Sequence, residues 1–245
     1  MRAFLFLLIL MQSHLFAEKI NVAVAANVSY AIEEIKSAFA KEYPDIQVNV
    51  ILGGSGKLAT QIKHGAPYGL FMSANMRYPQ ALYDDKIAIT KPVVYAQGAL
   101  AYLSVHPQDF SHAEAVLESK KIRRIAIANP KTAPYGVAAV AVLKNMKVYE
   151  KVKPKLVYGE SIAQTVAYAV TAADIGIVAK SALYSTKMVA YKEGVNWVSI
   201  NPALYQPIKQ GIVLMDGATS YRAFYNFILS KQVAEIFKKY GYTTP

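Results

Sequence analysis

Residues 50–60 read VILGGSGKLAT, an apolar run that ends in a glycine-rich turn and continues into a helix-like segment. The stretch is similar to the end of a nucleotide-binding loop, G-x-x-x-x-G-K-[ST]. Two positions fail, because Ile51 stands where the first Gly belongs and Leu58 replaces the metal-binding hydroxyl after Lys57. What remains is a strand at 46–52, a turn and a helix start. Free backbone N–H groups gather at such a place, which suits an anion.

Strands and helices are expected to alternate on both sides of this stretch. Hydrophobic periodicity predicts a first unit with strands at 20–25, 46–52 and 70–72 and helices at 29–42, 58–64 and 77–84. After Pro92 a second unit follows, with strands at 99–105, 125–128, 155–158 and 175–178 and helices at 137–144 and 162–172. This alternation is typical of mainly parallel sheets flanked by helices, so the predicted fold class is α/β.

The C-terminal segment differs from both units, because a strand at 206–215 is followed by two helices, at 219–229 and 232–240. We expect this segment to return to the first unit. The predicted architecture is therefore two lobes, with residues 18–96 and 206–245 in lobe 1 and residues 97–205 in lobe 2. Two crossings, near 95–98 and 203–207, would form the hinge. Ligands of open α/β sheets bind beyond the carboxyl ends of the strands, so the expected site is the cleft between the lobes.

The N-terminus has the order of a secretory signal peptide. Residues 1–17, MRAFLFLLILMQSHLFA, contain one Arg, an apolar run and a final small residue, although Leu15 stands where cleavage sites usually have a small side chain. The apolar run is too short to span a membrane. The chain has no Cys, which excludes a lipid anchor on an N-terminal Cys and rules out disulfides. We expect an exported chain without a lipid anchor.

The charge balance favours anionic partners in general. The chain has 27 Lys and Arg against 16 Asp and Glu, a formal net charge of +11, which attracts anions and acidic surfaces but does not determine the fold. The basic residues are scattered, and the one dense cluster, KKIRR at 120–124, is typical of a solvated helix end or loop. We therefore expect no nucleic acid partner.

The sequence gives little support for catalysis or for a bound metal cation. After the signal peptide the His residues are His64, His106 and His112, and none has ligand spacing to another His or to a carboxylate. The nucleophile elbow G-x-S-x-G fits as far as Ser55 but fails at Lys57. We expect neither an enzyme nor a cofactor. An exported hydrolase that acts through Ser55 remains a less favoured alternative.

Four predicted strand-to-helix junctions offer small residues and neutral hydrogen-bond donors. They are AANVS at 25–29 and GGSG at 53–56 in lobe 1, and NPKTAPYG at 129–136 and GESI at 159–162 in lobe 2. Each junction alone is typical of a helix cap. Because two come from each lobe, the four together would form a cage of N–H and O–H donors around one cleft.

Such a cage suits a fully ionised tetrahedral dianion. A protonated anion oxygen would find no acceptor there, and a buried mismatch of this kind costs ~1–3 kcal/mol. Phosphate keeps a proton near neutral pH and would be disfavoured. Helix N-termini spread the compensating charge without a buried cation that would be costly to desolvate. We expect Lys57 to point to solvent.

The junctions, with the exported two-lobe pattern, resemble the periplasmic molybdate-binding proteins of ABC molybdate and tungstate transporters. The resemblance covers nearly all of the chain after the signal peptide. Its most specific motifs are GSGKLATQI with GAP-x-x-x-F-x-SA, and NPKTAPYG. The other matching segments are VAVAANVSYAIEEI, GESIAQTVAYAV, DIGIVAKSAL and AFYNFILSKQVAEIFKKYGY.

The resemblance implies a type II periplasmic binding protein fold and a function in transport. Such a protein captures molybdate, and tungstate, between two lobes by a hinge motion. It then delivers the anion to the membrane permease of an ABC importer. The implied location is the periplasm and the implied state a monomer. Sulfate or another tetrahedral oxyanion remains the alternative ligand, because cage size decides among unprotonated dianions. A two-lobe effector domain of a regulator is disfavoured by the signal peptide and by the lack of a preceding helix-turn-helix.

The resemblance also assigns the oxyanion contacts to particular positions of this chain. They fall on the backbone of Ala26, on Asn27, on the hydroxyl and backbone of Ser55, and on the backbone N–H groups of Tyr135 and Ile162. Molybdenum would thus be held as molybdate by these residues and not as a free cation.

Four positions depart from the family pattern. Asn27 stands where many members carry Ser, and Ala179 where many carry a ligand-contacting Tyr. This combination resembles a second branch of the family. Gly69 and Asn75 replace an acidic or amide residue and a common Asp, respectively. These last two departures bear on the fine geometry of the cleft and not on the ligand class.

Overall fold

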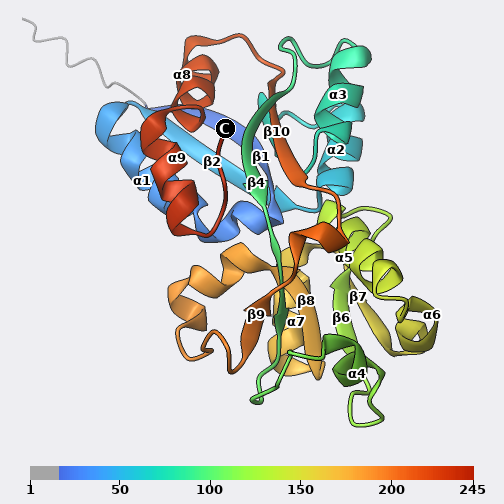
Figure 1. The fold of residues 1–245 in the computed structure, drawn as a ribbon. Helices are drawn as coiled ribbons and strands as arrows, with labels where there is room; N and C mark the ends of the chain where they lie inside the picture. The colour runs from blue at the N-terminus through green and yellow to red at the C-terminus, as the bar shows by residue number, and fades with distance from the viewer. Residues whose placement is uncertain (1–16) are drawn as a thin grey trace, which may run out of the picture.

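The computed structural model describes residues 17–245 and has two lobes, each a five-stranded sheet covered by helices (Figure 1). The predicted signal peptide lies outside the described residues except for Ala17. Within residues 17–245, no helix combines the length and the apolar character that crossing a bilayer requires.

The sheet of lobe 1 has the strand order β2-β1-β3-β10-β4. The central strand β1 (Glu18–Ala25) pairs in parallel with β2 (Ile46–Gly53) and with β3 (Leu70–Ser73). The late strand β10 (Ile208–Leu214) lies antiparallel between β3 and β4 (Val93–Gly98). The late strand β10 therefore belongs to the same sheet as β1, β2 and β3.

Helices cover both faces of this sheet. Alternate residues of β1 explain how, since successive strand side chains point to opposite faces. Val22 and Val24 pack into the cluster that includes Phe39 and Phe224, whereas Ala23 packs on the other face with Leu58. The first cluster belongs to α1 (Ile32–Glu42), α8 (Thr219–Ile228) and α9 (Lys231–Lys239), and the second to α2 (Ser55–Lys63) and α3 (Arg77–Asp84).

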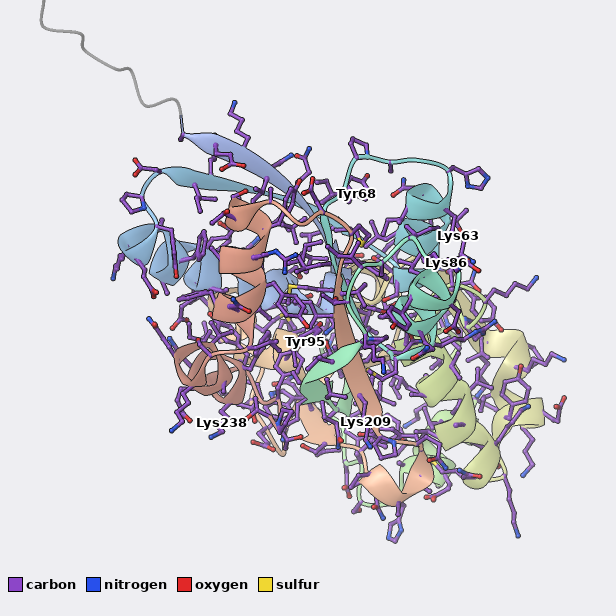
Figure 2. The ribbon with its side chains drawn as sticks, turned by 90° about the horizontal axis from the view of Figure 1, so that it is seen from above. Lys63, Tyr68, Lys86, Tyr95, Lys209 and Lys238 are labelled. Atoms are coloured by element: carbon purple, nitrogen blue, oxygen red, sulfur yellow. The ribbon has the colours of Figure 1, made fainter. Side chains whose placement is uncertain are left out.

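Aromatic side chains of the sheet are buried, whereas lysine side chains lie at the surface. Figure 2 shows Tyr95 of β4 in the middle of the molecule, where it is 4% exposed. The labelled lysines Lys63, Lys86 and Lys238 lie toward the periphery of that view and are exposed. The scattered positive charge is thus carried by solvated side chains.

The sheet of lobe 2 has the strand order β7-β6-β8-β5-β9. The parallel part consists of β6 (Ile125–Ala128), β7 (Leu156–Gly159) and β8 (Ile175–Ala179). The strand β5 (Leu100–Leu103) runs antiparallel to β8 and to β9 (Trp197–Ser199). The α-helices of the lobe are α4 (Ala113–Glu118), α5 (Pro134–Asn145), α6 (Tyr149–Val152) and α7 (Ile162–Thr171).

Short 3-10 helices fill several connections. They are η1 (Ala26–Tyr30), η2 (Lys153–Lys155), η3 (Lys180–Tyr184), η4 (Thr186–Met188) and η5 (Pro202–Leu204). The predicted helix at 29–42 is thus divided, because a 3-10 turn at 26–30 precedes α1. This turn places the residues after β1 at the carboxyl edge of the sheet.

The predicted α/β two-lobe fold is confirmed, and each sheet proves to be mixed. The chain passes from one sheet to the other between Gly98 of β4 and Leu100 of β5, and returns through residues 200–207. Residues 95–98, where the first crossing was expected, belong instead to β4 and pair with β10, with one register shift between Gln210 and Gly211. This pairing places the first crossing at the very end of β4.

Candidate functional site

The four predicted junctions meet at one small cavity between the lobes. Its volume is ≈ 10 Å³, roughly what one ordered water needs. The carboxyl ends of β1, β2 and β3 and the first residues of α2, α5 and α7 surround it. All the positions assigned from the sequence line this cavity: Ala26, Asn27, Ser55, Tyr135 and Ile162.

Ser55 begins α2 directly after the extended Gly54 and is 1% exposed. Its hydroxyl oxygen accepts a hydrogen bond from the N–H of Ala74 at 2.9 Å. Because that bond occupies the oxygen as an acceptor, the hydroxyl proton is left to donate elsewhere. The backbone N–H of Ser55 has no acceptor within the helix, as at every helix start. Ser55 therefore offers two donors.

Tyr135 offers the first N–H of α5, because Pro134 before it has none. The next two N–H groups, of Gly136 and Val137, both turn back to the carbonyl oxygen of Ala133, at 2.9 and 3.3 Å. The carbonyl oxygen of Ala133 thus accepts from the N–H groups of Gly136 and Val137, whereas the N–H of Tyr135 has no acceptor in the helix.

Ile162 has a comparable position at the start of α7. The cap residue Ser161 uses its hydroxyl to accept from the N–H of Gln164, and its carbonyl oxygen accepts from Thr165 at 3.0 Å. The N–H of Ile162, the first residue of the helix, has no acceptor within the helix. Lobe 2 therefore contributes two backbone donors.

Ala26 and Asn27 open the 3-10 helix η1, which has no side-chain cap. Asn27 is fully buried. Its side-chain NH2 donates to Oε1 of Gln210 at 2.8 Å and to the hydroxyl of Tyr242 at 3.0 Å. Its Oδ1 is buried and has no partner among the described residues. Asn27 thus lines the cavity, its NH2 group bonds to the protein behind it, and its Oδ1 is left unpaired.

A buried polar network surrounds Asn27, and sequence reasoning missed it. Gln210 bonds to Tyr95 at 2.8 Å and to Tyr135 at 3.3 Å, while Tyr242 donates to the carbonyl oxygen of Asn27 at 2.8 Å. Burial raises the pKa values of Tyr95 and Tyr135 well above 10 and that of Tyr242 to about 12. These hydroxyls therefore stay protonated at neutral pH.

The electrostatic character of the cavity comes from backbone dipoles. None of the described residues that line it carries a formal charge at neutral pH. Lys57 pairs with Glu160 across the lobes at 3.6 Å, outside the lining, and its side chain is 61% exposed. Residues 17–245 contain no group of three His, Asp or Glu side chains placed to hold a metal ion. The cavity thus has helix N-termini, with their partial positive charge, and no counter-ion.

The lobes are closed around the cavity. The N–H of Gly56 in α2 donates to the carbonyl oxygen of Thr132, in the loop before α5, at 2.9 Å. Gly54 lies so near lobe 2 that a methyl group on it would be 3.0 Å from the carbonyl oxygen of Glu160. These close backbone approaches join the start of α2 to lobe 2.

Of the four positions that depart from the family pattern, Asn27 lines the cavity, and the other three, Gly69, Asn75 and Ala179, lie outside the lining. Gly69 precedes β3, at the strand end far from the cavity, where it leaves room for the ring of Tyr221. Asn75 caps the turn into α3, since its Oδ1 accepts from the N–H of Tyr78 at 3.3 Å. Ala179 ends β8 in the core of lobe 2. Gly69 and Asn75 therefore act on the cavity only through the elements that they support.

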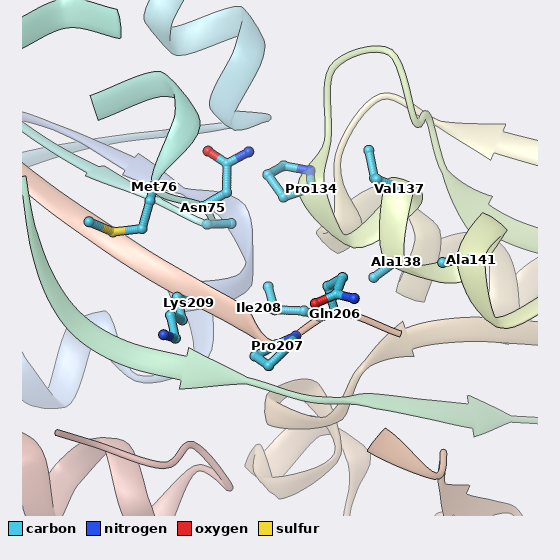
Figure 3. Close-up of a pocket in the computed structure, with 11 residues that line it drawn as sticks. Asn75, Met76, Pro134, Val137, Ala138, Ala141, Gln206, Pro207, Ile208 and Lys209 are labelled. Atoms are coloured by element: carbon cyan, nitrogen blue, oxygen red, sulfur yellow. The ribbon is translucent and has the colours of Figure 1, made fainter. Parts of the chain in front are cut away.

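A larger groove of ≈ 350 Å³ opens beside the cavity. Figure 3 shows Asn75 and Met76 of lobe 1 on one side of it and Val137 and Ala138 of α5 on the other. Its lining is mostly apolar. None of the residues assigned as oxyanion contacts lines this groove.

Comparison with known proteins decides the family. A family model for bacterial extracellular solute-binding proteins matches residues 20–243. The chain belongs to this family. Among the relatives of this solute-binding protein is the molybdate-binding protein ModA of Rhodobacter capsulatus, 36% identical over 93% of this chain and 89% of the relative. The ModA protein of Azotobacter vinelandii is 34% identical over 92% of this chain and 90% of the relative.

A solved structure agrees with the sequence comparison. The periplasmic molybdate-binding protein of Azotobacter vinelandii superposes with a TM-score of 0.83 at 28% identity, covering 92% of this chain and 99% of that one. The resemblance to molybdate-binding proteins that the sequence motifs indicated is therefore confirmed, both by the sequence comparisons and by the fold.

Proposed function

We propose that this solute-binding protein captures molybdate, and with it tungstate, between its lobes for delivery to the membrane permease of an ABC importer. The observation that carries the proposal is the single cavity at which helix starts from both lobes present unpaired donors. Relatives named as molybdate-binding proteins, 36% and 34% identical over most of the chain, support this ligand.

The proposed contacts follow from the free donors. Ser55 donates through its hydroxyl and its backbone N–H. The backbone N–H groups of Tyr135 and Ile162 approach from lobe 2, and those of Ala26 and Asn27 from lobe 1. The assignment rests on the closeness of all five residues to one cavity and on the unpaired N–H groups that each helix start leaves.

The donor set favours a dianion without a proton. The described lining contains no carboxylate and no imidazole, and the Ser55 oxygen already accepts from Ala74. The unpaired side-chain acceptor among the lining residues is Asn27 Oδ1, so a protonated oxygen of hydrogen phosphate that does not reach it would lose its hydrogen bond to water, which costs ~1–3 kcal/mol.

Capture would proceed by hinge closure. The two chain crossings lie side by side, because the hydroxyl of Tyr205 in the second accepts from the N–H of Leu100 just after the first, at 3.1 Å. We take residues 18–96 and 206–245 as one rigid body and 97–205 as the other. An anion that binds donors from both bodies would stabilise the closed form, which the permease then recognises.

The site supports a binding protein and not an enzyme. A serine nucleophile needs a base within hydrogen-bond reach, whereas the Ser55 hydroxyl is bonded to the backbone N–H of Ala74. A ligand of the same chemical class, sulfate above all, is the second candidate, since it presents the same charge and shape to the same donors. Export through the signal peptide at 1–17, a periplasmic location and a monomeric state complete the proposal.

Calorimetric titration of residues 18–245 with molybdate, tungstate, sulfate and phosphate tests the ligand. We expect tight binding of molybdate and tungstate and weak or no binding of phosphate. Tight binding of sulfate alone would keep the site and change the ligand. No binding of any of the four anions would overturn the proposed function.

A further inference from the structure

Two buried amides, Asn27 and Gln210, form the centre of the network behind the cavity. Both side chains are fully buried, and they come from η1 and β10, 183 positions apart in the chain. Asn27 lines the cavity and Gln210 does not. Gln210 in turn bonds to Tyr135, whose backbone lines the cavity from lobe 2. Gln210 thus connects cage segments of both lobes.

The hydrogen-bonding pattern of the structure leaves two groups unsatisfied. The Asn27 NH2 donates to Gln210 Oε1, and Gln210 Nε2 donates to the Tyr135 hydroxyl. In this pattern Asn27 Oδ1 is buried without a donor. The proton of the Tyr135 hydroxyl also has no acceptor among the described residues. A buried unpaired acceptor beside an anion site is doubly unfavourable, because it has no hydrogen bond and repels the ligand.

A second pattern uses the same atomic positions. An amide that turns by half a revolution exchanges its oxygen and nitrogen, whereas a hydroxyl can donate or accept where it stands. If both amides turn, Gln210 Nε2 donates to Asn27 Oδ1 across the same 2.8 Å. Tyr135 then donates to Gln210 Oε1 across the same 3.3 Å, and its proton is satisfied.

The neighbouring hydroxyls can accommodate this second pattern. Tyr95 would accept from Gln210 and donate to the carbonyl oxygen of Ser73, which lies at 3.4 Å. Tyr242 would donate to Asn27 Oδ1 across 3.0 Å, while the carbonyl oxygen of Asn27 keeps its bond from Ser181 at 3.2 Å. The group left unpaired is then the Asn27 NH2, which is a donor.

We propose that in the oxyanion complex Asn27 and Gln210 take the second pattern, in which Gln210 donates to Asn27 Oδ1 and the Asn27 NH2 donates to the bound anion. Gln210 is the positioning residue of this arrangement, since Asn27 can present its NH2 to the anion only when Gln210 presents a donor to Asn27. The inference rests on the proposed oxyanion function. It adds a residue outside the cavity that determines whether Asn27 attracts or repels the ligand.

Neutron diffraction from deuterated crystals grown with molybdate tests the arrangement in the unaltered protein. We expect the Gln210 side-chain deuterons to point at Asn27 Oδ1 and Tyr95, and the Asn27 deuterons to point at the anion. Asn27 deuterons directed at Gln210 Oε1 in the complex would overturn the inference while leaving the proposed function intact. A protein that binds no oxyanion in calorimetry would instead overturn the proposed function.

Binding kinetics of two variants provide the functional test. Gln210→Met removes the amide without adding charge, and Tyr95→Phe removes a hydroxyl of the same network that bonds Gln210 but not Asn27. We expect Gln210→Met to raise the molybdate Kd about tenfold or more, mainly through faster dissociation, as loss of a bond to a charged ligand predicts. Tyr95→Phe should change it by less than about threefold.

The matched pair separates positioning from general stability. If Gln210 serves only the core, both variants lower Tm and their Kd values shift alike, which would overturn the inference. If Gln210→Met does not fold, the neutron experiment decides alone, because it uses the unaltered chain.

Discussion

The backbone N–H of Gly56 in lobe 1 donates to the carbonyl oxygen of Thr132 in lobe 2, at an N···O distance of 2.9 Å. The bond joins the first turn of α2 to the loop that leads into α5, and both segments border the cavity. It can exist only while the lobes are together. Closure is therefore stabilised by a direct backbone contact in addition to any ligand.

Gly56→Ala should weaken ligand binding by preventing this approach. A Cβ at position 56 would lie 2.9 Å from the Thr132 oxygen and 2.7 Å from the Tyr78 hydroxyl, closer than such atoms pack. We expect the molybdate Kd to rise about tenfold or more, with Tm of the free protein little changed because Ala favours the helix. Gly217→Ala is the control, since its Cβ would meet the flexible end of Arg222 at 3.3 Å and the end of Ile89 at an ordinary 3.5 Å. Equal molybdate affinities for the two variants would contradict a role of the Gly56–Thr132 contact in closure.

Ser55→Ala should reduce affinity through loss of one charge-assisted hydrogen bond. Such bonds contribute about 1.5–3 kcal/mol, so we expect the molybdate Kd to rise roughly 10- to 100-fold. Ser37→Ala is the matched control, because Ser37 is a Ser of α1 whose hydroxyl bonds only to Glu33. Calorimetry of both variants measures the difference. Adding Asn27→Ala should weaken binding further while the fold persists, and an unchanged Kd in that double variant would remove the site assignment.

Lys57→Ala tests whether helix ends, and not a cation, hold the ligand. The ammonium of Lys57 is exposed and lies beside Glu160 rather than in the cavity lining. We expect the molybdate Kd to change by less than about threefold, and the change to shrink as salt screens the charge. A loss comparable to that of Ser55→Ala, persisting in high salt, would mean that Lys57 contacts the anion.

The buried tyrosines predict a loss of stability in alkali. Burial raises the pKa of Tyr242 from 10 to about 12, and that of Tyr30 likewise to about 12. A raised folded-state pKa stabilises the protein fully below pH 10, and this contribution is lost as the pH rises from 10 to 12. Tm measured against pH should therefore fall in this window. The Tm of the Tyr242→Phe variant should fall less steeply with pH than the Tm of the parent chain. Identical slopes would contradict the assignment of this effect to Tyr242.

Much of the fold was predictable because the local patterns are strong. Strands β1, β2 and β6 are short apolar runs followed by turns, and their predicted and observed ranges agree within two residues. Two helix starts were predicted three residues late, since α2 begins at Ser55 and not at 58, and α5 at Pro134 and not at 137. The first turns there consist of Gly, Ser and Pro, which carry no apolar periodicity. Those turns are the ones that line the cavity.

The network behind the site had no local signal. Asn27 contacts Gln210 and Tyr242, which lie 183 and 215 positions away in the sequence. These partners come together only because β10 inserts between β3 and β4 and the C-terminus returns to lobe 1. A single Gln within an apolar strand is ordinarily read as a satisfied core residue, so its role depends on topology that periodicity does not encode.

The most direct test of the central claim is the position of the bound anion. Crystals of residues 18–245 grown with tungstate would locate the metal atom by its anomalous scattering. We predict a single strong peak in the cavity between Ser55, Tyr135 and Ile162, within hydrogen-bonding distance, through its oxygens, of donors from both lobes. A peak elsewhere, such as in the groove beside Met76 and Val137, or no peak at saturating tungstate, would contradict the account.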